Sequence, residues 1–90
     1  MKSLGFVETE GYVPAFAVAD AMAKAANVEL VKKVWVGAGM VTIVVKGEVG
    51  DVTTAVDAGA TTANNMNALI SCLAIAHPAK EFVAALGYEE

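Results

Sequence analysis

The stretch KVWVGAGMVTIVVKG, from Lys33 to Gly47, constrains the fold of this chain more than any other segment. It consists of two apolar runs, rich in the β-branched residues that favour strands, joined by Gly37-Ala38-Gly39. So short a connection allows only a tight turn, and glycines supply the positive φ that hairpin turns need. We therefore predict a β-hairpin that is apolar at nearly every position, so that its open face is apolar too.

The composition makes such a hairpin hard to accommodate in an isolated subunit. Of the 90 residues, 57% are hydrophobic and 18% charged, whereas ordinary domains carry about 25% charged residues. A chain of this size forms one domain, here residues 1–90, with one core. Small proteins usually cover excess apolar surface by oligomerisation, so we expect self-association.

Charge and cysteine content argue against several function classes. The formal net charge is −4, so a basic surface for nucleic acid is not expected. We see no signal peptide and no apolar run long enough to span a membrane. The single cysteine, Cys72, fits a reducing compartment, and we expect a cytoplasmic protein.

Hydrophobic periodicity predicts strands and helices in a definite order. The expected strands are 2–9, 28–36, 40–47 and 69–76, and the expected helices are 13–27, 47–66 and one that starts at residue 79 and ends near Gly87. This order is the βαββαβ pattern of ferredoxin-like α+β domains, with helices on one face of a four-stranded antiparallel sheet, plus a short C-terminal helix. The fold serves many unrelated functions and does not identify one.

The two long helices are each predicted to bury an apolar stripe. The first stripe consists of Phe16, Ala19, Met22, Ala23 and Ala26. The second consists of Val49, Val52, Val56, Ala60, Ala63 and Met66, with Asp51, Thr54, Thr61 and Asn65 facing away. Because both helices are rich in alanine and glycine, we expect them to lie close to the sheet.

Few residues are suited to catalysis or metal binding. Cys72 and His77 are five residues apart, which on a strand places them on opposite faces, so a nucleophilic Cys–His pair is not expected. One histidine and one cysteine cannot form a closed zinc site, and we predict no metal and no cofactor. Glu8 and Glu10 share a strand face and could form an acid–base pair, although a solvated strand end is the simpler interpretation.

The other candidate residues also have simple structural explanations. Residues 37–39 lack the Lys-Ser/Thr of a phosphate-binding loop and precede a strand instead of a helix. Trp35 suits packing, and Lys24 suits the C-terminal end of a helix dipole. His77 and Pro78 suit the exit from a strand.

Three segments, DAMAKAANVELV, VGAGMVTIVVKGEVGDV and AVDAGATTA, follow one another in a distinctive order. They contain a Lys-Ala-Asn helix end, a Gly-x-Gly turn, a basic-Gly-acidic-Val helix entry and an Asp-Ala-Gly helix centre. Together they resemble the BMC-domain shell proteins of bacterial microcompartments, in the single-domain class that forms hexamers. The similarity runs from about Leu4 to Pro78. It implies a non-enzymatic structural protein of a microcompartment shell.

The resemblance also implies a pore. In that family six subunits form a flat disc, and the hairpin turn of each subunit points at the six-fold axis. Gly37, Ala38 and Gly39 would then line a narrow channel for small metabolites, with Trp35 at its approach. Relatives often have Ser or Gly in place of Ala38. Because Ala38 presents a methyl group and no hydroxyl, we expect selectivity here to rest on pore width and backbone dipoles.

A second implication concerns the edge between hexamers. Lys24 matches an edge lysine that packs antiparallel to its partner across a two-fold axis, and Asn27 matches a nearby edge asparagine. His77 stands where the family often has an arginine, and it is followed by the matching Pro78. Because histidine is shorter and changes charge between about pH 5 and 8, we expect weaker or pH-dependent tiling.

The resemblance implies partners as well: a homo-hexamer, other shell paralogues and vertex proteins. The terminal helix, with Phe82, Val83 and Leu86 on one face, either caps the subunit or binds targeting peptides of cargo enzymes. Two other functions stay open, namely a small-molecule sensor of ferredoxin-like fold that binds its ligand at a subunit interface, and a small enzyme that uses Glu8 and Glu10.

Overall fold

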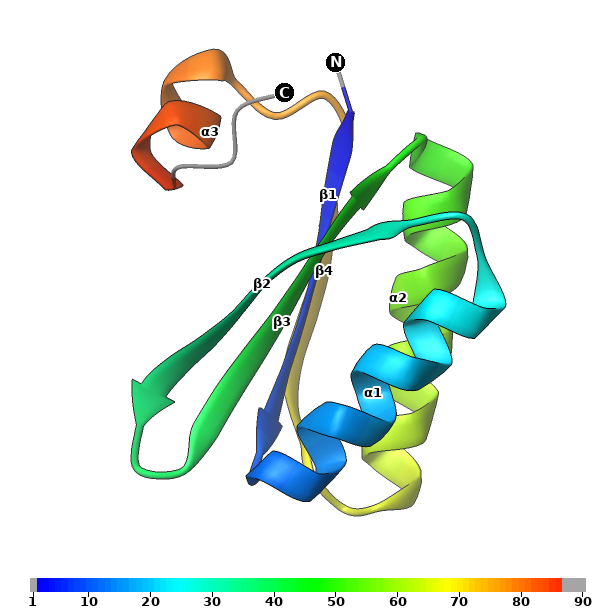
Figure 1. Cartoon of the computed structure of the whole chain (residues 1–90), viewed down its shortest axis with the longest axis vertical. Coiled ribbons are helices and arrows are strands. Elements are labelled where there is room, and N and C mark those ends of the chain that lie inside the picture. Colours follow the sequence, from blue (N-terminus) through cyan, green and yellow to red (C-terminus); the bar gives the residue numbers. More distant parts are fainter. Residues whose placement is uncertain (1, 87–90) are drawn as a thin grey trace.

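The computed structural model describes residues 2–86, and Figure 1 shows their arrangement. The strands are β1 (Ser3–Glu10), β2 (Glu29–Gly37), β3 (Met40–Gly47) and β4 (Leu69–Ile75), and the helices are α1 (Tyr12–Ala25), α2 (Val49–Asn65) and α3 (Lys80–Leu86). The predicted elements are confirmed in kind and order. The predicted end of the last helix, near Gly87, lies outside the described residues.

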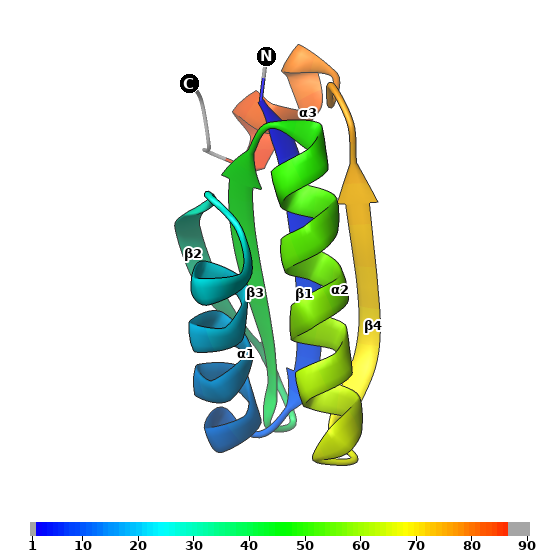
Figure 2. The same ribbon diagram turned by 90° about the vertical axis from the view of Figure 1, so that its right-hand side faces the viewer.

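The strands form one antiparallel sheet in the order β2-β3-β1-β4. β1 and β3 are therefore the inner strands, and β2 and β4 are the edges. Figure 2 shows α1 and α2 side by side on one face of this sheet. The predicted βαββαβ arrangement is confirmed. None of the helices in the described part of the chain is long and apolar enough to cross a membrane.

The main hydrophobic core lies between the sheet and the two long helices. Alternate residues of β3 point into it, as the two-residue period of a strand requires. Its buried members are Val7, Ala15, Val18, Met22, Val41, Ile43, Val45, Val52, Ala55, Val56 and Ala63. Burial of each large apolar side chain contributes about 1.5–3 kcal/mol to the folded state.

A smaller hydrophobic cluster lies on the opposite face of the sheet, beneath α3. Val83 of α3 is buried there against Leu4 and Val44. The partly buried residues around them are Phe6, Val31 and Leu86. The terminal helix therefore caps part of the sheet through Val83 and Leu86, whereas Phe82 is exposed.

The buried stripe of α1 is rotated by about one position from the prediction, although Met22 is buried and Ala19 and Ala26 are partly buried, as expected. Ala15, Val18 and Met22 are fully buried, whereas Phe16 and Ala23 are exposed. α1 is apolar around most of its circumference, so the 3.6-residue period is compatible with either stripe.

The stripe of α2 is confirmed at its centre and wrong at its ends. The buried residues of α2 are Val52, Ala55, Val56, Gly59 and Ala63. Val49 and Met66 are exposed because they lie at the two ends of the helix, beyond the core. Of the residues expected to face away, Thr54, Thr61 and Asn65 are exposed and Asp51 is partly buried.

Two glycines let α2 approach its neighbours closely. A Cβ atom on Gly5 of β1 would lie 2.6 Å from Cγ2 of Val56. A Cβ atom on Gly59 would lie 2.8 Å from Cγ of Met22 in α1. The absence of both side chains thus permits one helix–sheet contact and one helix–helix contact at short range.

Substitution Gly5→Ala should lower the free energy of unfolding by about 1–3 kcal/mol, because the new methyl group must displace packed valines of α2. Gly50→Ala is the matched control, since a Cβ atom on Gly50 meets nothing within 4 Å. It should change stability by less than about 1 kcal/mol, in the stabilising direction. Urea unfolding at a fixed protein concentration measures both, and equal effects would contradict the close-packing argument.

Candidate functional site

The β2–β3 turn, predicted to line a pore, projects from one end of the subunit (Figure 1). Gly37, Ala38 and Gly39 have φ values of 91°, 52° and 81°. Glycine adopts such left-handed values freely, whereas alanine is strained by its Cβ. All three residues are exposed, and a Cβ on either glycine would meet no atom within 4 Å. The subunit itself therefore leaves the space around the turn unfilled.

The turn is attached to the corner between β1 and α1. The N–H of Gly11 donates a hydrogen bond to the carbonyl of Gly39 over 2.7 Å. The corner is fixed in turn by Thr9, whose buried hydroxyl lies 3.3 Å from the carbonyl oxygen of Gly11 as its acceptor. The position of the turn thus depends on a segment far from it in sequence.

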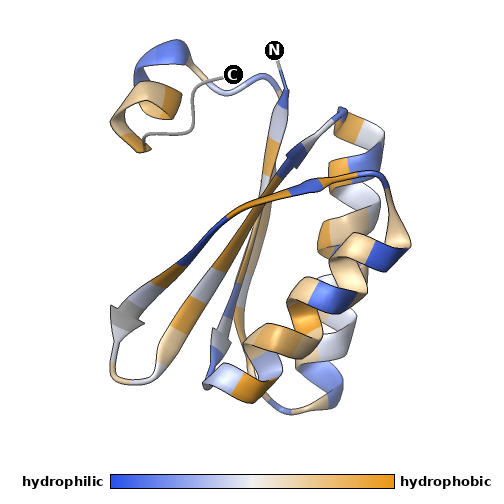
Figure 3. Ribbon diagram, viewed as in Figure 1, coloured by the Kyte–Doolittle hydropathy of each residue, from blue (hydrophilic) through white to orange (hydrophobic). Residues whose placement is uncertain are grey.

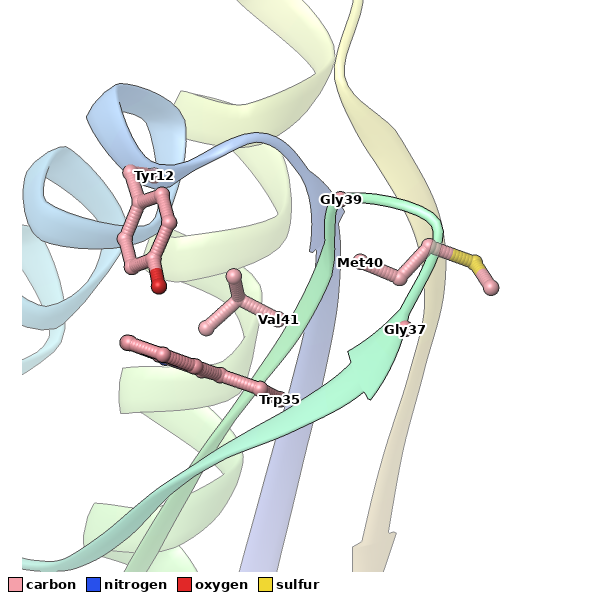
Figure 4. Close-up of a pocket in the computed structure, with 6 residues that line it drawn as sticks. All are labelled: Tyr12, Trp35, Gly37, Gly39, Met40 and Val41. Atoms are coloured by element: carbon pink, nitrogen blue, oxygen red, sulfur yellow. The ribbon is translucent and has the colours of Figure 1, made fainter.

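Trp35 lies beside the turn and packs on Tyr12. The two ring centroids are 4.8 Å apart and the ring planes meet at 89°, so Tyr12 stands edge-on to the indole. Figure 4 shows the hydroxyl end of Tyr12 directed toward Trp35. Even so, 63% of Trp35 is exposed. Within the subunit, Trp35 therefore packs against the ring of Tyr12 and also lies next to the turn.

A small hollow of ≈ 160 Å³ separates these rings from the turn. Besides Tyr12 and Trp35, its lining consists of Gly37, Gly39, Met40 and Val41 (Figure 4). The sequence analysis did not select Tyr12. The register of β1 against β3 would have identified Tyr12. Glu10 pairs with Met40, so the residues that follow β1 must lie beside the turn.

The aromatic surface continues along α1. The Nζ atom of Lys33 lies 4.5 Å from the ring centroid of Phe16 and 6.0 Å from that of Tyr12. A lysine over an aromatic face gains a favourable cation–π interaction. This explains why Phe16 is exposed and not part of the core: its ring packs with Tyr12 and Lys33 at the rim of the sheet.

Exposed apolar residues occur along both edges of the sheet. On the side of β2 and α1 they are Tyr12, Val13, Phe16, Leu30 and Trp35, and on β4 they are Ile70 and Leu73. Figure 3 shows apolar stretches on the hairpin and on the adjoining end of α1, with hydrophilic stretches between them on β2. β4 contains no charged residue, and proteins usually protect such an edge strand by pairing or covering it.

Lys24 lies in the last turn of α1, with 75% of its side chain exposed. Its Nζ atom lies 2.8 Å from Oδ2 of Asp20. The hydrogen bond and the negative charge of Asp20 raise the pKa of Lys24. Asn27 follows the helix and is exposed, and its backbone carbonyl lies against Gly47.

His77 and Pro78 follow β4. His77 is exposed and has a left-handed φ of 50°, whereas Pro78 is buried. The segment that carries them leaves β4 at the end of the molecule opposite the β2–β3 turn (Figure 1). The structure therefore separates the predicted tiling residues His77 and Pro78 from the predicted pore residues.

The carboxylate of Glu8 lies on the face of the sheet away from α1 and α2. It accepts hydrogen bonds from the hydroxyls of Thr42 and Ser71, over 3.3 and 3.4 Å. Both partners stand opposite Glu8 on the neighbouring strands, so the contacts follow from strand register. Glu10 is exposed, as expected of a solvated strand end.

The residues with metal-binding or nucleophilic chemistry are dispersed. Within residues 2–86, no group of three or more His, Cys, Asp and Glu residues could hold a metal ion. Cys72 is a free, exposed thiol on β4. Among the described residues, the exposed turn and the two apolar sheet edges are therefore the candidate functional surfaces.

Comparison with known proteins gives consistent results. The family model of the BMC domain matches residues 3–78. Carboxysome shell protein CsoS1A of Hydrogenovibrio crunogenus is 46% identical over 89 residues, which cover 98% of this chain and 93% of the relative. CsoS1C of the same organism is 49% identical over 88 residues, covering 94% and 86%. Carboxysome shell protein CsoS1 of Prochlorococcus marinus is 46% identical over 86 residues, covering 94% and 84%.

A solved structure has the same fold. The crystal structure of a microcompartment protein from Desulfitobacterium hafniense matches with a TM-score of 0.85 and 28% sequence identity. The match covers 100% of the present chain but 49% of that protein, so the chain spans about half the length of this structural relative.

The strain at Ala38 can be tested directly. Ala38→Val should lower the free energy of unfolding by about 1 kcal/mol, because a β-branched side chain tolerates a left-handed φ poorly. Ala38→Asn should leave stability within about 0.5 kcal/mol, since asparagine adopts this conformation readily. Thermal unfolding at matched concentrations compares the two, and a Val variant as stable as the Asn variant would contradict a left-handed Ala38.

Proposed function

The chain belongs to the BMC-domain family of bacterial microcompartment shell proteins, and we propose that six copies of it form a cyclic hexamer. In this proposal residues 1–90 make up one BMC domain, and the hexamers tile into a sheet. The turn of each subunit faces a central pore for small metabolites.

The position of the exposed apolar residues carries this proposal. A ring of identical subunits needs two different surfaces on each subunit, because each contact joins one surface to the other surface of the next copy. The exposed apolar residues of β2 and α1 and those of β4 belong to opposite edges of the same sheet. Contact between such edges would remove both from water and cover the uncharged strand β4.

The pore proposal is supported by the turn. Its residues are small and exposed, and they stand at one end of the subunit with open space around them. Six side chains can meet around one axis only if each is small. Filtering would then depend on aperture and on the backbone groups of residues 37–39, with no bond-making step and no metal or cofactor.

The tiling proposal concerns Lys24, Asn27, His77 and Pro78. Lys24 and His77 are exposed, and each is available to a neighbouring hexamer. The ion pair with Asp20 favours the charged form of Lys24 and restricts the orientation of its side chain. We propose that Lys24, Asn27 and His77 form the edge between hexamers, with the buried Pro78 fixing the chain next to His77. We propose other shell paralogues, vertex proteins and cargo peptides as further partners.

Assembly tests both proposals. The purified protein should have a mass near six times 9.2 kDa in solution and form sheets at high concentration. Lys24→Ala should abolish the sheets and preserve the hexamers, because Lys24 acts only between hexamers. Lys80→Ala, which removes an exposed lysine on α3, is the matched control and should form sheets normally.

Light scattering and negative-stain electron microscopy measure these outcomes. A stable monomer would refute the hexamer. Dimers or trimers with saturable binding of a small molecule would support the rival sensor function instead.

The pore can be tested at Ala38. Ala38→Asn keeps the left-handed conformation but adds six amide groups to the pore, so it should lower the conductance of single hexamers at least about twofold. Phe82→Ala is a control, because Phe82 is exposed on α3, away from the turn. Hexamers of both variants should form normally, and unchanged conductance in Ala38→Asn would count against a pore at this turn.

A further inference from the structure

The β2–β3 turn has few contacts of its own. Around Gly37 and Gly39 there is space for a Cβ with no neighbour within 4 Å, and the hollow of ≈ 160 Å³ lies directly beside the turn. Left-handed φ values at three successive residues define its local shape. The pairing of β1 with β3 positions the hairpin as far as Met40, so the position of residues 37–39 beyond that pair depends on further contacts.

Two described contacts provide that position, and both come from the β1–α1 corner. One is the 2.7 Å hydrogen bond from Gly11 N–H to the Gly39 carbonyl. The other is the edge-on packing of Tyr12 against Trp35, the second-last residue before Gly37. The two contacts hold the turn on opposite sides of the hollow, as Figure 4 shows for Tyr12, Trp35 and Gly39.

The corner has the rigidity that such a role requires. Gly11 has φ 100° and ψ 157°, a combination that is essentially restricted to glycine, and its N–H donates to the turn. The buried hydroxyl of Thr9 lies within hydrogen-bond distance of the carbonyl oxygens of Gly11 and Val41, at 3.3 and 3.5 Å. Tyr12 begins α1, which is packed on the sheet through Ala15 and Val18. Displacement of the turn must therefore break contacts with a fixed element.

We infer that Gly11 and Tyr12 are positioning residues that set the aperture of the pore by bracing the β2–β3 turn against the β1–α1 corner. This inference rests on the proposed pore. Each contact is repeated in every subunit, so a small outward or inward shift of the turn changes the channel from six sides at once. Loss of the Tyr12 ring would leave the β1–β3 pairing up to Met40 and the Gly11–Gly39 hydrogen bond to hold the turn, next to an enlarged hollow.

The test uses the full-length protein and the variants Tyr12→Ala and Tyr12→Phe. The phenylalanine variant keeps the ring that contacts Trp35. Phe82→Ala is the matched control, because it also removes an exposed aromatic ring but lies on α3, away from the turn. The first readout is hydrogen exchange of the Gly11 amide by NMR, which reports directly on its bond to Gly39 whether or not a hexamer forms. The second readout is the conductance of single hexamers.

Tyr12→Ala should increase exchange of the Gly11 amide about tenfold, because the aromatic contact no longer opposes opening of the turn. It should also change the mean conductance and broaden its distribution, whereas Tyr12→Phe and Phe82→Ala should match the original protein. Unchanged exchange in Tyr12→Ala would overturn the brace. Faster exchange with unchanged conductance would overturn its control of the aperture. A protein that forms no hexamer would refute the proposed function, and the exchange measurement would still decide the brace.

Discussion

Gly5 leaves no side chain between β1 and α2, and the close contact that results governs how the helices cover the sheet. With α2 resting on β1 and β4 and α1 packed beside it through Gly59, both helices bury the same face. α2 also contacts the outer strand β4, but α1 makes few contacts with the outer strand β2, so Trp35 stays exposed on the helix-covered face. Leu73 is exposed for a different reason, because it pairs with Phe6 and lies on the face of the sheet away from α1 and α2. The packing of the core thus accounts for the exposed surface on the side of β2.

In the hairpin, buried apolar side chains, exposed side chains and backbone strain occur in three different parts. Its inner strand β3 is buried on alternate residues by the helices and, at Val44, by α3. Its outer strand β2 carries Lys33 and Trp35, which lie against Phe16 and Tyr12 instead of entering the core. The turn between the strands is small, left-handed and exposed. Strain at Ala38 is tolerable because the neighbouring glycines and the Gly11 hydrogen bond determine the turn together.

Much of the fold could be predicted because it is encoded locally. The tight turn at residues 37–39 follows from the shortness of this connection and from its glycines. The order of strands and helices follows from the periodicity of apolar residues. The stripe of α1 could not be chosen in this way. Phe16 and Val18 are both apolar, and only the position of the sheet decides which one is buried. The same reason explains the wrong assignment of Val49 and Met66, since periodicity does not show where the core ends.

The candidate site was predictable only in part. The turn, Lys24 and His77 are recognisable as segments, but Tyr12 became significant only when the register of β1 against β3 placed it next to Trp35. By itself the sequence determined the elements, their order, the excess of apolar surface and the family resemblance, because these depend on residues close together in the chain. Tertiary structure alone decided which apolar side chains stay exposed and what braces the turn, because those properties depend on contacts between residues far apart in the chain.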